Sequence, residues 1–381
     1  KHRACTGGRV TFQVTLMALP LSASLRRDAL PDTAPPRPAA PEPLAKAGTY
    51  IRSREFDTTL LAAPIGAGLV TALAVTADAR LYPFLLVADL WLLGYHHVIA
   101  TYTRLAFDTQ SLRRNRFLAV DLLVIVTAMT LVVAMLAGAW VIATAFLYLQ
   151  WFHYMRQGYG IARMYYRATP EGQVAGSRDL TADLAIYLVP IYGIAARSAT
   201  MGDRFLGLPV KAIVLPDPII MLLGVAAVAA VIAWMARRAR AALADTLDVR
   251  YTAFVASHIL IFLVAYVFMA NVNNGWLAIN VWHNFQYVLV VWMSNARRYA
   301  GGIDPTARFL SRLSQPGRVK MYFACCLAIT TFVYLALDRF TALVLGGSLA
   351  ITIGIYMGIN FHHYIVDALI WKRRRAASQA A

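Results

Sequence analysis

Long apolar stretches alternate with short polar loops from about Thr58 to the end of the chain. Because a helix needs about 20 apolar residues to cross the hydrocarbon core of a bilayer, each stretch predicts one membrane-spanning helix. The predicted fold class is therefore all-α, a polytopic transmembrane helical bundle of about ten spans. The expected spans are residues 58–78, 81–107, 117–137, 139–163, 180–197, 212–236, 251–270, 275–297, 319–337 and 341–371.

The composition supports a membrane protein. Of the 381 residues, 59% are hydrophobic and only 14% are charged, and the mean hydropathy is +0.56, whereas a soluble globular protein has about 25% charged residues. These values exclude an ordinary soluble enzyme, a disordered chain and a disulfide-rich secreted module. We expect the transmembrane domain to occupy residues 57–375, with a short C-terminal tail at 376–381.

Residues 1–56 differ from the rest and are expected to form a disordered, basic, proline-rich tail. Six prolines fall within residues 31–44, and such a segment has too little apolar surface to pack. Residues 10–24 follow three basic residues and resemble a signal peptide, but Pro20 and several polar residues interrupt the apolar run. A disordered leader, or one that is not translated, is the preferred interpretation.

The net charge of +17 is explained by membrane topology. If the N-terminus is placed in the cytoplasm, twenty Lys and Arg residues fall at cytoplasmic positions and five in external loops. Cytoplasmic loops of membrane proteins carry an excess of Lys and Arg, so this distribution predicts an even number of spans with both termini in the cytoplasm. We therefore expect a multi-pass protein of a bacterial-type inner (plasma) membrane, and no nucleic-acid partner.

Seven of the eight histidines fall inside the predicted spans. Ionisable side chains within a bilayer are costly and usually face the interior of a bundle or a cavity. At 1.5 Å per residue, these histidines lie about 10–21 Å along their helices from the basic residues at the cytoplasmic ends. A shared depth on five helices favours one metal or cofactor site over unrelated polar residues. The predicted ligands are His96, His97, His153, His258, His283, His362 and His363.

Amide, hydroxyl and carboxylate side chains accompany the histidines at helical spacing. Gln150, His153 and Gln157, for example, share one stripe of a helix. Metal-bound histidines almost always donate their second ring N–H to such a group, although the same side chains can also hold helices together in a membrane. The predicted partners of the histidines are Asp89, Gln150, Gln157, Asn280, Asn284, Gln286, Tyr287 and Asp367.

Imidazole and oxygen donors without cysteine suit iron, zinc, copper or manganese. Several histidines with room for open positions favour non-haem iron, with zinc, copper or haem as the alternatives. A site buried in the cytoplasmic half of the bilayer is accessible to an apolar, lipid-like substrate such as an isoprenoid. Reaction with oxygen there would add an electron donor to the expected partners.

Six of the seven histidines lie in four segments rich in aromatic residues: Tyr95-His96-His97, Phe152-His153-Tyr154, Trp282-His283-Asn284 and Phe361-His362-His363-Tyr364. In this respect residues 80–375 resemble, in class, the integral-membrane non-haem iron oxygenases, which include fatty-acid desaturases, hydroxylases and the bacterial enzymes that cleave β-carotene. Desaturases have histidines separated by two or three residues, whereas here they are adjacent or single. The helical layout with many spans is nearer to the carotene-cleaving type. The resemblance implies a metal-dependent membrane oxidoreductase of oxygenase or hydroxylase type, and it assigns no catalytic residue.

Three other functions fit parts of this pattern. Two opposed histidines on different helices could be the axial ligands of a haem-binding membrane protein. Histidine and aspartate side chains inside a membrane could form the proton relay of a proton-coupled transporter. A membrane transferase could use the segment Trp282-His283-Asn284 as its catalytic core.

Overall fold

The computed structural model describes residues 50–343, 346 and 348–379. Residues 1–49 of the predicted tail, which was expected to span residues 1–56, lie outside the described residues. Its last residues belong to the helical domain, because Ile51 and Phe56 are buried and the Ile51 amide donates to Asp57 Oδ2. At the other end, helix continues to Gln379, through most of the tail expected at 376–381.

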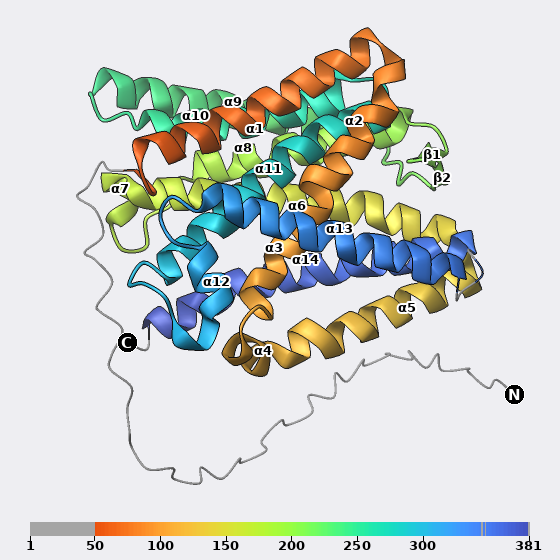
Figure 1. The fold of residues 1–381 in the computed structure, drawn as a ribbon. Coiled ribbons are helices and arrows are strands. Elements are labelled where there is room, and N and C mark those ends of the chain that lie inside the picture. Colours follow the sequence, from red (N-terminus) through yellow and green to blue (C-terminus); the bar gives the residue numbers. More distant parts are fainter. Residues whose placement is uncertain (1–49, 344–345, 347, 380–381) are drawn as a thin grey trace, which may run out of the picture. The chain divides into compact units, whose positions relative to one another are not determined.

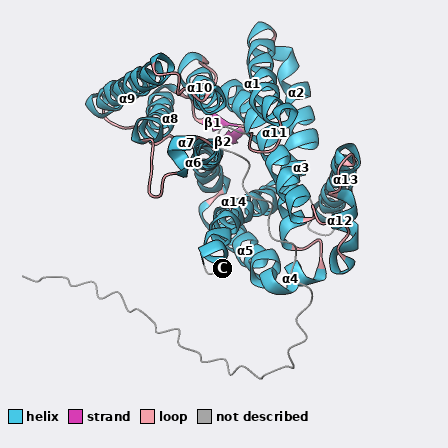
Figure 2. Ribbon diagram, turned by 90° about the vertical axis from the view of Figure 1, so that its left-hand side faces the viewer, coloured by secondary structure: helices cyan, strands magenta, loops and turns pink. Residues whose placement is uncertain are grey.

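Helices make up nearly all of the described chain (Figure 2). Each of the ten apolar stretches forms one long helical segment, and three of these segments are continuous runs of two or more elements. The long segments are α1 (Arg54–Ala77); η1 (Ala79–Leu81), α2 (Tyr82–Asp89), η2 (Leu90–Gly94) and α3 (Tyr95–Leu105); α4 (Thr109–Arg116), η3 (Phe117–Asp121) and α5 (Leu122–Ala137); α6 (Ala139–Ala168); α8 (Leu180–Thr200); α9 (Asp217–Leu243); α10 (Val249–Leu263) with η4 (Val264–Phe268); α11 (Val272–Arg298); α13 (Val319–Leu343); and α14 (Leu349–Gln379).

Short elements connect some of these helices. They are α7 (Pro170–Gln173), η5 (Pro305–Ala307), α12 (Arg308–Leu313) and the antiparallel strands β1 (Arg204–Phe205) and β2 (Leu208–Pro209). Polar side chains cap the helix starts, as at α1, where the Ser53 hydroxyl accepts from the Phe56 amide, and at α10, where Asp248 accepts from the Tyr251 amide. Such caps satisfy backbone N–H groups that have no partner within the helix.

Within the described residues, seven helical segments are long and apolar enough to cross a membrane. They are α1, the run from η1 to α3, the run from α4 to α5, α8, α9, α10 with η4, and α13. The all-α, multi-pass membrane character that the sequence predicts is therefore supported. The number of ten spans and the cytoplasmic position of both termini stay predictions.

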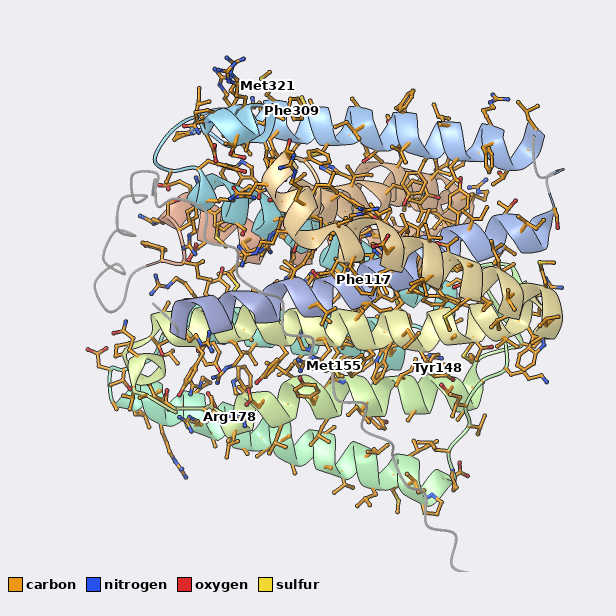
Figure 3. All side chains as sticks on the ribbon, turned by 90° about the horizontal axis from the view of Figure 1, so that it is seen from below. Phe117, Tyr148, Met155, Arg178, Phe309 and Met321 are labelled. Carbon is orange, nitrogen blue, oxygen red and sulfur yellow. The ribbon has the colours of Figure 1, made fainter. Side chains whose placement is uncertain are left out.

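The outer surface of the helices is apolar. Phe117, Phe309 and Met321 are each more than half exposed, and Phe309 and Met321 lie at the edge of the bundle in Figure 3, whereas Met155 on α6 is buried. Exposed apolar side chains also line α9, from Ile219 to Met235. Apolar surface this extensive is unfavourable in water and is satisfied by contact with lipid.

Helix α11 has the most buried side chains in the bundle and packs against α1 and α3. Helix α6 contacts α8 and α10 on one side and α5 and α14 on the other. The two helices therefore lie inside the bundle, between these groups (Figure 1). Neither α6 nor α11 is among the seven most apolar segments, because their buried faces carry polar side chains.

Three π-helical turns interrupt the long helices, and each has a carbonyl that accepts from a side chain. The Leu92 carbonyl oxygen in η2 lies 3.3 Å from His96 Nδ1, and the Leu118 carbonyl oxygen in η3 lies 2.7 Å from His362 Nε2. In η4, the Tyr266 carbonyl accepts from Arg197 Nε at 3.2 Å. A π-turn inserts one residue into the helix and disturbs the regular backbone ladder, so a side chain can bond to a carbonyl there.

Replacing Gly158 by Ala tests how closely α6 approaches α10. A Cβ at this position would lie 2.2 Å from Nδ1 of the buried His258, so the helices would have to move apart. We expect the Gly158→Ala variant to lose about 1–3 kcal/mol of stability, as other overpacked cores do, measured as a lower unfolding temperature in detergent.

Gly160 on the same helix provides the matched control. A Cβ there meets no atom within 4 Å, and Ala favours helix over Gly by about 1 kcal/mol. Gly160→Ala should therefore keep or raise the unfolding temperature. An equal response of the two variants would contradict the close approach at Gly158.

Candidate metal centre

Four buried histidines from four helices meet inside the bundle. They are His97 of α3, His153 of α6, His283 of α11 and His363 of α14, and we call them the histidine cluster. Ligand nitrogens of His97, His153 and His363 all lie within 4.8 Å of one another, which is close enough for one metal ion. The ring of His283 lies with its centroid 4.9 Å from those of both His97 and His153.

The alternation of helix directions explains why these four histidines share a height. Short loops join most successive long segments, so neighbours in the chain run in opposite directions. The segments with the cluster are the second, fourth, eighth and tenth, and they therefore run the same way. Each histidine comes before a basic residue at the end of its helix, for example Arg104 on α3 and Arg167 on α6.

The other three predicted ligands lie outside the cluster. His96 and His362 bond to the carbonyls of the π-turns η2 and η3 and lie on a different face of their helices from the adjacent cluster member. This division is expected, because adjacent residues of an α-helix point about 100° apart. His258 bonds through Nε2 to the Ile186 carbonyl at 3.1 Å and packs against Phe262 and Trp282.

A chain of hydrogen bonds leads away from His363. Its Nδ1 lies 3.0 Å from the Thr101 hydroxyl, which lies 2.9 Å from the Tyr287 hydroxyl, and Tyr287 donates to Asp367 Oδ1 at 2.7 Å. Because Tyr287 uses its one proton on Asp367, it accepts from Thr101, and Thr101 in turn accepts from His363 Nδ1–H. The proton on Nδ1 leaves the lone pair of His363 Nε2 free to face the cluster.

Nε2 of His363 lies 2.7 Å from Nε2 of His97. Two such nitrogens can share one proton, or they can move apart slightly to share a metal ion. In a tetrahedral site with bonds of 2.0–2.1 Å, ligand nitrogens are about 3.3 Å apart. A shift of roughly half an ångström between two side chains would therefore accommodate an ion.

A second polar network lies next to His283, on the opposite side of the cluster from Asp367. Asn280 donates to Asp89 Oδ2, and the Tyr154 hydroxyl donates to Asn280 Oδ1. The Tyr154 ring lies 4.2 Å from that of His283. Gln150 extends the network, with Nε2 3.3 Å from Asn280 Oδ1 and Oε1 2.8 Å from the donor Trp276 Nε1.

The remaining predicted partners have weaker links to the histidine rings. Asn284 Nδ2 lies 3.5 Å from Asp89 Oδ1, and Gln157 Nε2 donates to the backbone carbonyl of His283 at 3.0 Å. Gln286 is buried, and its Oε1 has no hydrogen-bond partner among the described residues. Among the described residues, neither Gln157 nor Gln286 makes a hydrogen bond to a cluster ring, whereas the Asn284 side chain approaches the ring of His97.

Sequence reasoning left Thr101, Tyr154 and Trp276 out of the predicted partners. Thr101 is four residues after His97, so helical spacing alone could have identified it. Trp276 reaches the site only through Gln150 on another helix, and no spacing within one helix indicates that contact.

Three cluster nitrogens have no hydrogen-bond partner among the described residues. They are Nδ1 of His97, Nε2 of His153 and Nδ1 of His283. An unsatisfied buried polar atom costs about 1–3 kcal/mol and calls for an explanation such as a bound ion. Neutral imidazoles with unused nitrogens, arranged around one point, are a suitable donor set for a transition metal.

The chain shows no significant match to any protein-family model, curated protein or solved structure with which it was compared. A function for this chain is therefore inferred from the geometry of its histidine cluster.

Replacing Tyr287 by Phe tests the hydrogen-bond chain. The variant keeps the ring that stacks on His97, at 3.9 Å between centroids, but removes the hydroxyl that bridges Thr101 and Asp367. We expect a loss of about 1–3 kcal/mol, measured by thermal unfolding, because buried polar atoms lose a partner.

Tyr364→Phe is the matched control. Tyr364 also stacks on a cluster histidine, His153, at 4.6 Å, but its hydroxyl has no partner among the described residues. Removing that hydroxyl should change the unfolding temperature little. If both tyrosine variants behave alike, the chain from His363 to Asp367 does not have the role described.

Proposed function

We propose that the histidine cluster binds a non-haem metal ion, with iron preferred, in a membrane-embedded oxidoreductase of oxygenase or hydroxylase type that acts on a lipid or isoprenoid. The observation that carries the proposal is the convergence of ligand nitrogens from His97, His153 and His363 within 4.8 Å. When bound, such a metal would supply the activation of oxygen for attack on a substrate. His283, whose ring adjoins two of the three, is a further candidate ligand.

A metal explains the cluster better than helix association alone. Polar residues that only hold helices together bond to one another, as Gln150, Asn280 and Trp276 do. The cluster instead buries ring nitrogens that have no partner among the described residues, on His97, His153 and His283. The Thr101 hydroxyl holds the proton on His363 Nδ1. This keeps the lone pair on Nε2 available to bind a metal, as in metal sites where a partner fixes the histidine tautomer.

Haem fits the cluster less well than a single ion. Its two axial ligands must lie on opposite faces of the porphyrin, whereas Nε2 atoms of His97 and His363 are 2.7 Å apart. Among single ions, zinc and copper also accept imidazole ligands. Iron is preferred because a histidine site with open coordination positions suits oxygen chemistry.

The surroundings of the cluster support an apolar substrate. Its helices lie within a bundle whose outer surface is apolar, so a lipid can approach from the bilayer without crossing water. Hydroxylation by oxygen consumes two more electrons than the substrate provides, so the proposal includes an electron donor as a partner.

Metal analysis tests the proposal directly. Protein purified from iron-replete cells should contain stoichiometric iron, and the variants His153→Ala and His363→Ala should lose most of it because each removes a ligand. His362→Ala is the control that should retain the metal, since its ring faces the Leu118 carbonyl. Wild-type protein without metal, even after reloading, would count against the proposal.

Oxygen uptake tests the reaction class. Iron-loaded protein in lipid nanodiscs, supplied with a chemical reductant and an isoprenoid, should consume oxygen and oxidise the isoprenoid, and His97→Ala protein should do neither. Metal-containing protein that consumes no oxygen under these conditions would contradict an oxygenase.

A proton-coupled transporter is the second candidate, favoured by the hydrogen-bonded chain from His363 through Thr101 and Tyr287 to Asp367. Such chains can relay protons inside a membrane. Solute uptake driven by a pH gradient in metal-free proteoliposomes would support the transporter over the oxidoreductase.

A further inference from the structure

A groove lies beside the histidine cluster, between η2 and α3, α11 and α13. It has a volume of about 230 Å³. Leu92 and Ala324 line it and are exposed, so the groove reaches the outer surface of the helices, where lipid is expected. Apart from His96, it is lined by apolar side chains, chiefly Leu92, Leu93, Phe285, Val288, Leu289 and Phe323.

His96 is the polar side chain that lines this groove, and the metal proposal does not use it. It is only 4% exposed, and its Nε2 has no hydrogen-bond partner among the described residues. The Phe323 ring packs edge-on at 5.7 Å between centroids and offers no hydrogen bond. A buried, unpartnered ring nitrogen in an otherwise apolar groove indicates a ligand with one polar group.

The other nitrogen of His96 determines which kind of polar group fits. Nδ1 lies 3.3 Å from the Leu92 carbonyl, and a carbonyl can only accept, so Nδ1 carries the proton. In a neutral imidazole the second nitrogen is then an acceptor. The ligand must therefore donate a hydrogen bond to Nε2, which a hydroxyl group does and a ketone, an ester or an ether does not.

We infer that this groove binds a long-chain alcohol of isoprenoid or acyl type, with its hydroxyl donating to His96 Nε2. No charged side chain lines the groove, which favours a neutral head over a phosphate or a carboxylate. The volume is below the 300–1,000 Å³ usual for a complete ligand. The groove therefore holds the hydroxyl end of the molecule, and the rest of the chain extends into the bilayer.

The position of the groove connects it to the metal centre. His96 is adjacent in sequence to His97, so their Cα atoms are about 3.8 Å apart, although the two rings leave the helix about 100° apart. This assigns the alcohol as the substrate of the proposed oxidoreductase and rests on that proposal. Binding of the alcohol itself depends only on the groove and His96.

Equilibrium binding to protein in phosphatidylcholine nanodiscs tests the inference, with tritiated farnesol as the probe and farnesyl methyl ether as its competitor. The ether has the same chain but no donor. Wild-type protein should bind the alcohol roughly three- to tenfold more tightly than the ether, as expected for one hydrogen bond. The variant His96→Phe, which keeps a ring but no acceptor, should lose this preference.

His362→Ala is the matched control, because His362 is also the outer member of a histidine pair and also bonds to a π-turn carbonyl. It does not line the groove, and it should keep the preference for the alcohol. Equal binding of alcohol and ether to wild-type protein would overturn the inference, whether or not the variants fold. A preference that survives in His96→Phe would overturn it too.

Iron measured in the same samples separates this inference from the proposed function. If the protein prefers the alcohol but contains no iron, the groove is an alcohol site and the proposed oxidoreductase is rejected. If the protein contains stoichiometric iron but does not prefer the alcohol, the metal centre is supported and the alcohol is rejected as its substrate.

Discussion

The cost of an unpaired polar group in apolar surroundings governs the arrangement of this bundle. A helix inside a bilayer satisfies its own backbone, but a histidine or an aspartate on its surface has to find a partner on another helix. The polar side chains of α3, α6, α11 and α14 therefore turn toward one another. The resulting networks, one through Asn280 and one through Tyr287, hold the four helices around the histidine cluster.

The π-turns contribute to this arrangement in a specific way. Each places a carbonyl within reach of a side chain, and two of them bind histidines that face away from the cluster, His96 and His362. The π-turn carbonyl gives a hydrogen-bond partner to the histidine that faces away from the cluster, His96 or His362. The other member of the pair, His97 or His363, is then directed into the bundle. The local irregularity of the backbone thus helps to fix which member of each pair can act as a ligand.

Sequence reasoning placed the histidines at one depth, and four of the seven do converge. Depth is one coordinate only, and His258 illustrates the limit. It was expected at a similar height, but α10 packs against Gly158 on the far side of α6, so its ring points to Ile186. Lateral position depends on which helices pack together, and a single sequence without contacts between helices does not determine that.

Hydropathy likewise predicted where the long helices lie but treated them as equivalent. In the structure α6 and α11 are less apolar than the seven segments suited to face lipid, and both lie inside the bundle. Their polar residues reduce hydropathy for the same reason that they mark the site. The lower hydropathy of α6 and α11 was therefore itself an indication, present in the sequence, of which helices carry the site.

The carboxylate of Asp89 adds an electrostatic argument for a cation in the cluster. Asp89 is 3% exposed, and the groups that approach it are the amides of Asn280 and Asn284. Among the described residues, no Lys or Arg forms an ion pair with it. Amides donate hydrogen bonds but carry no charge, so Asp89 in its charged form has no counter-charge among the described residues. The proposed metal ion, held by neutral imidazoles next to this network, would supply one and would join the polar network and the histidines in a single site.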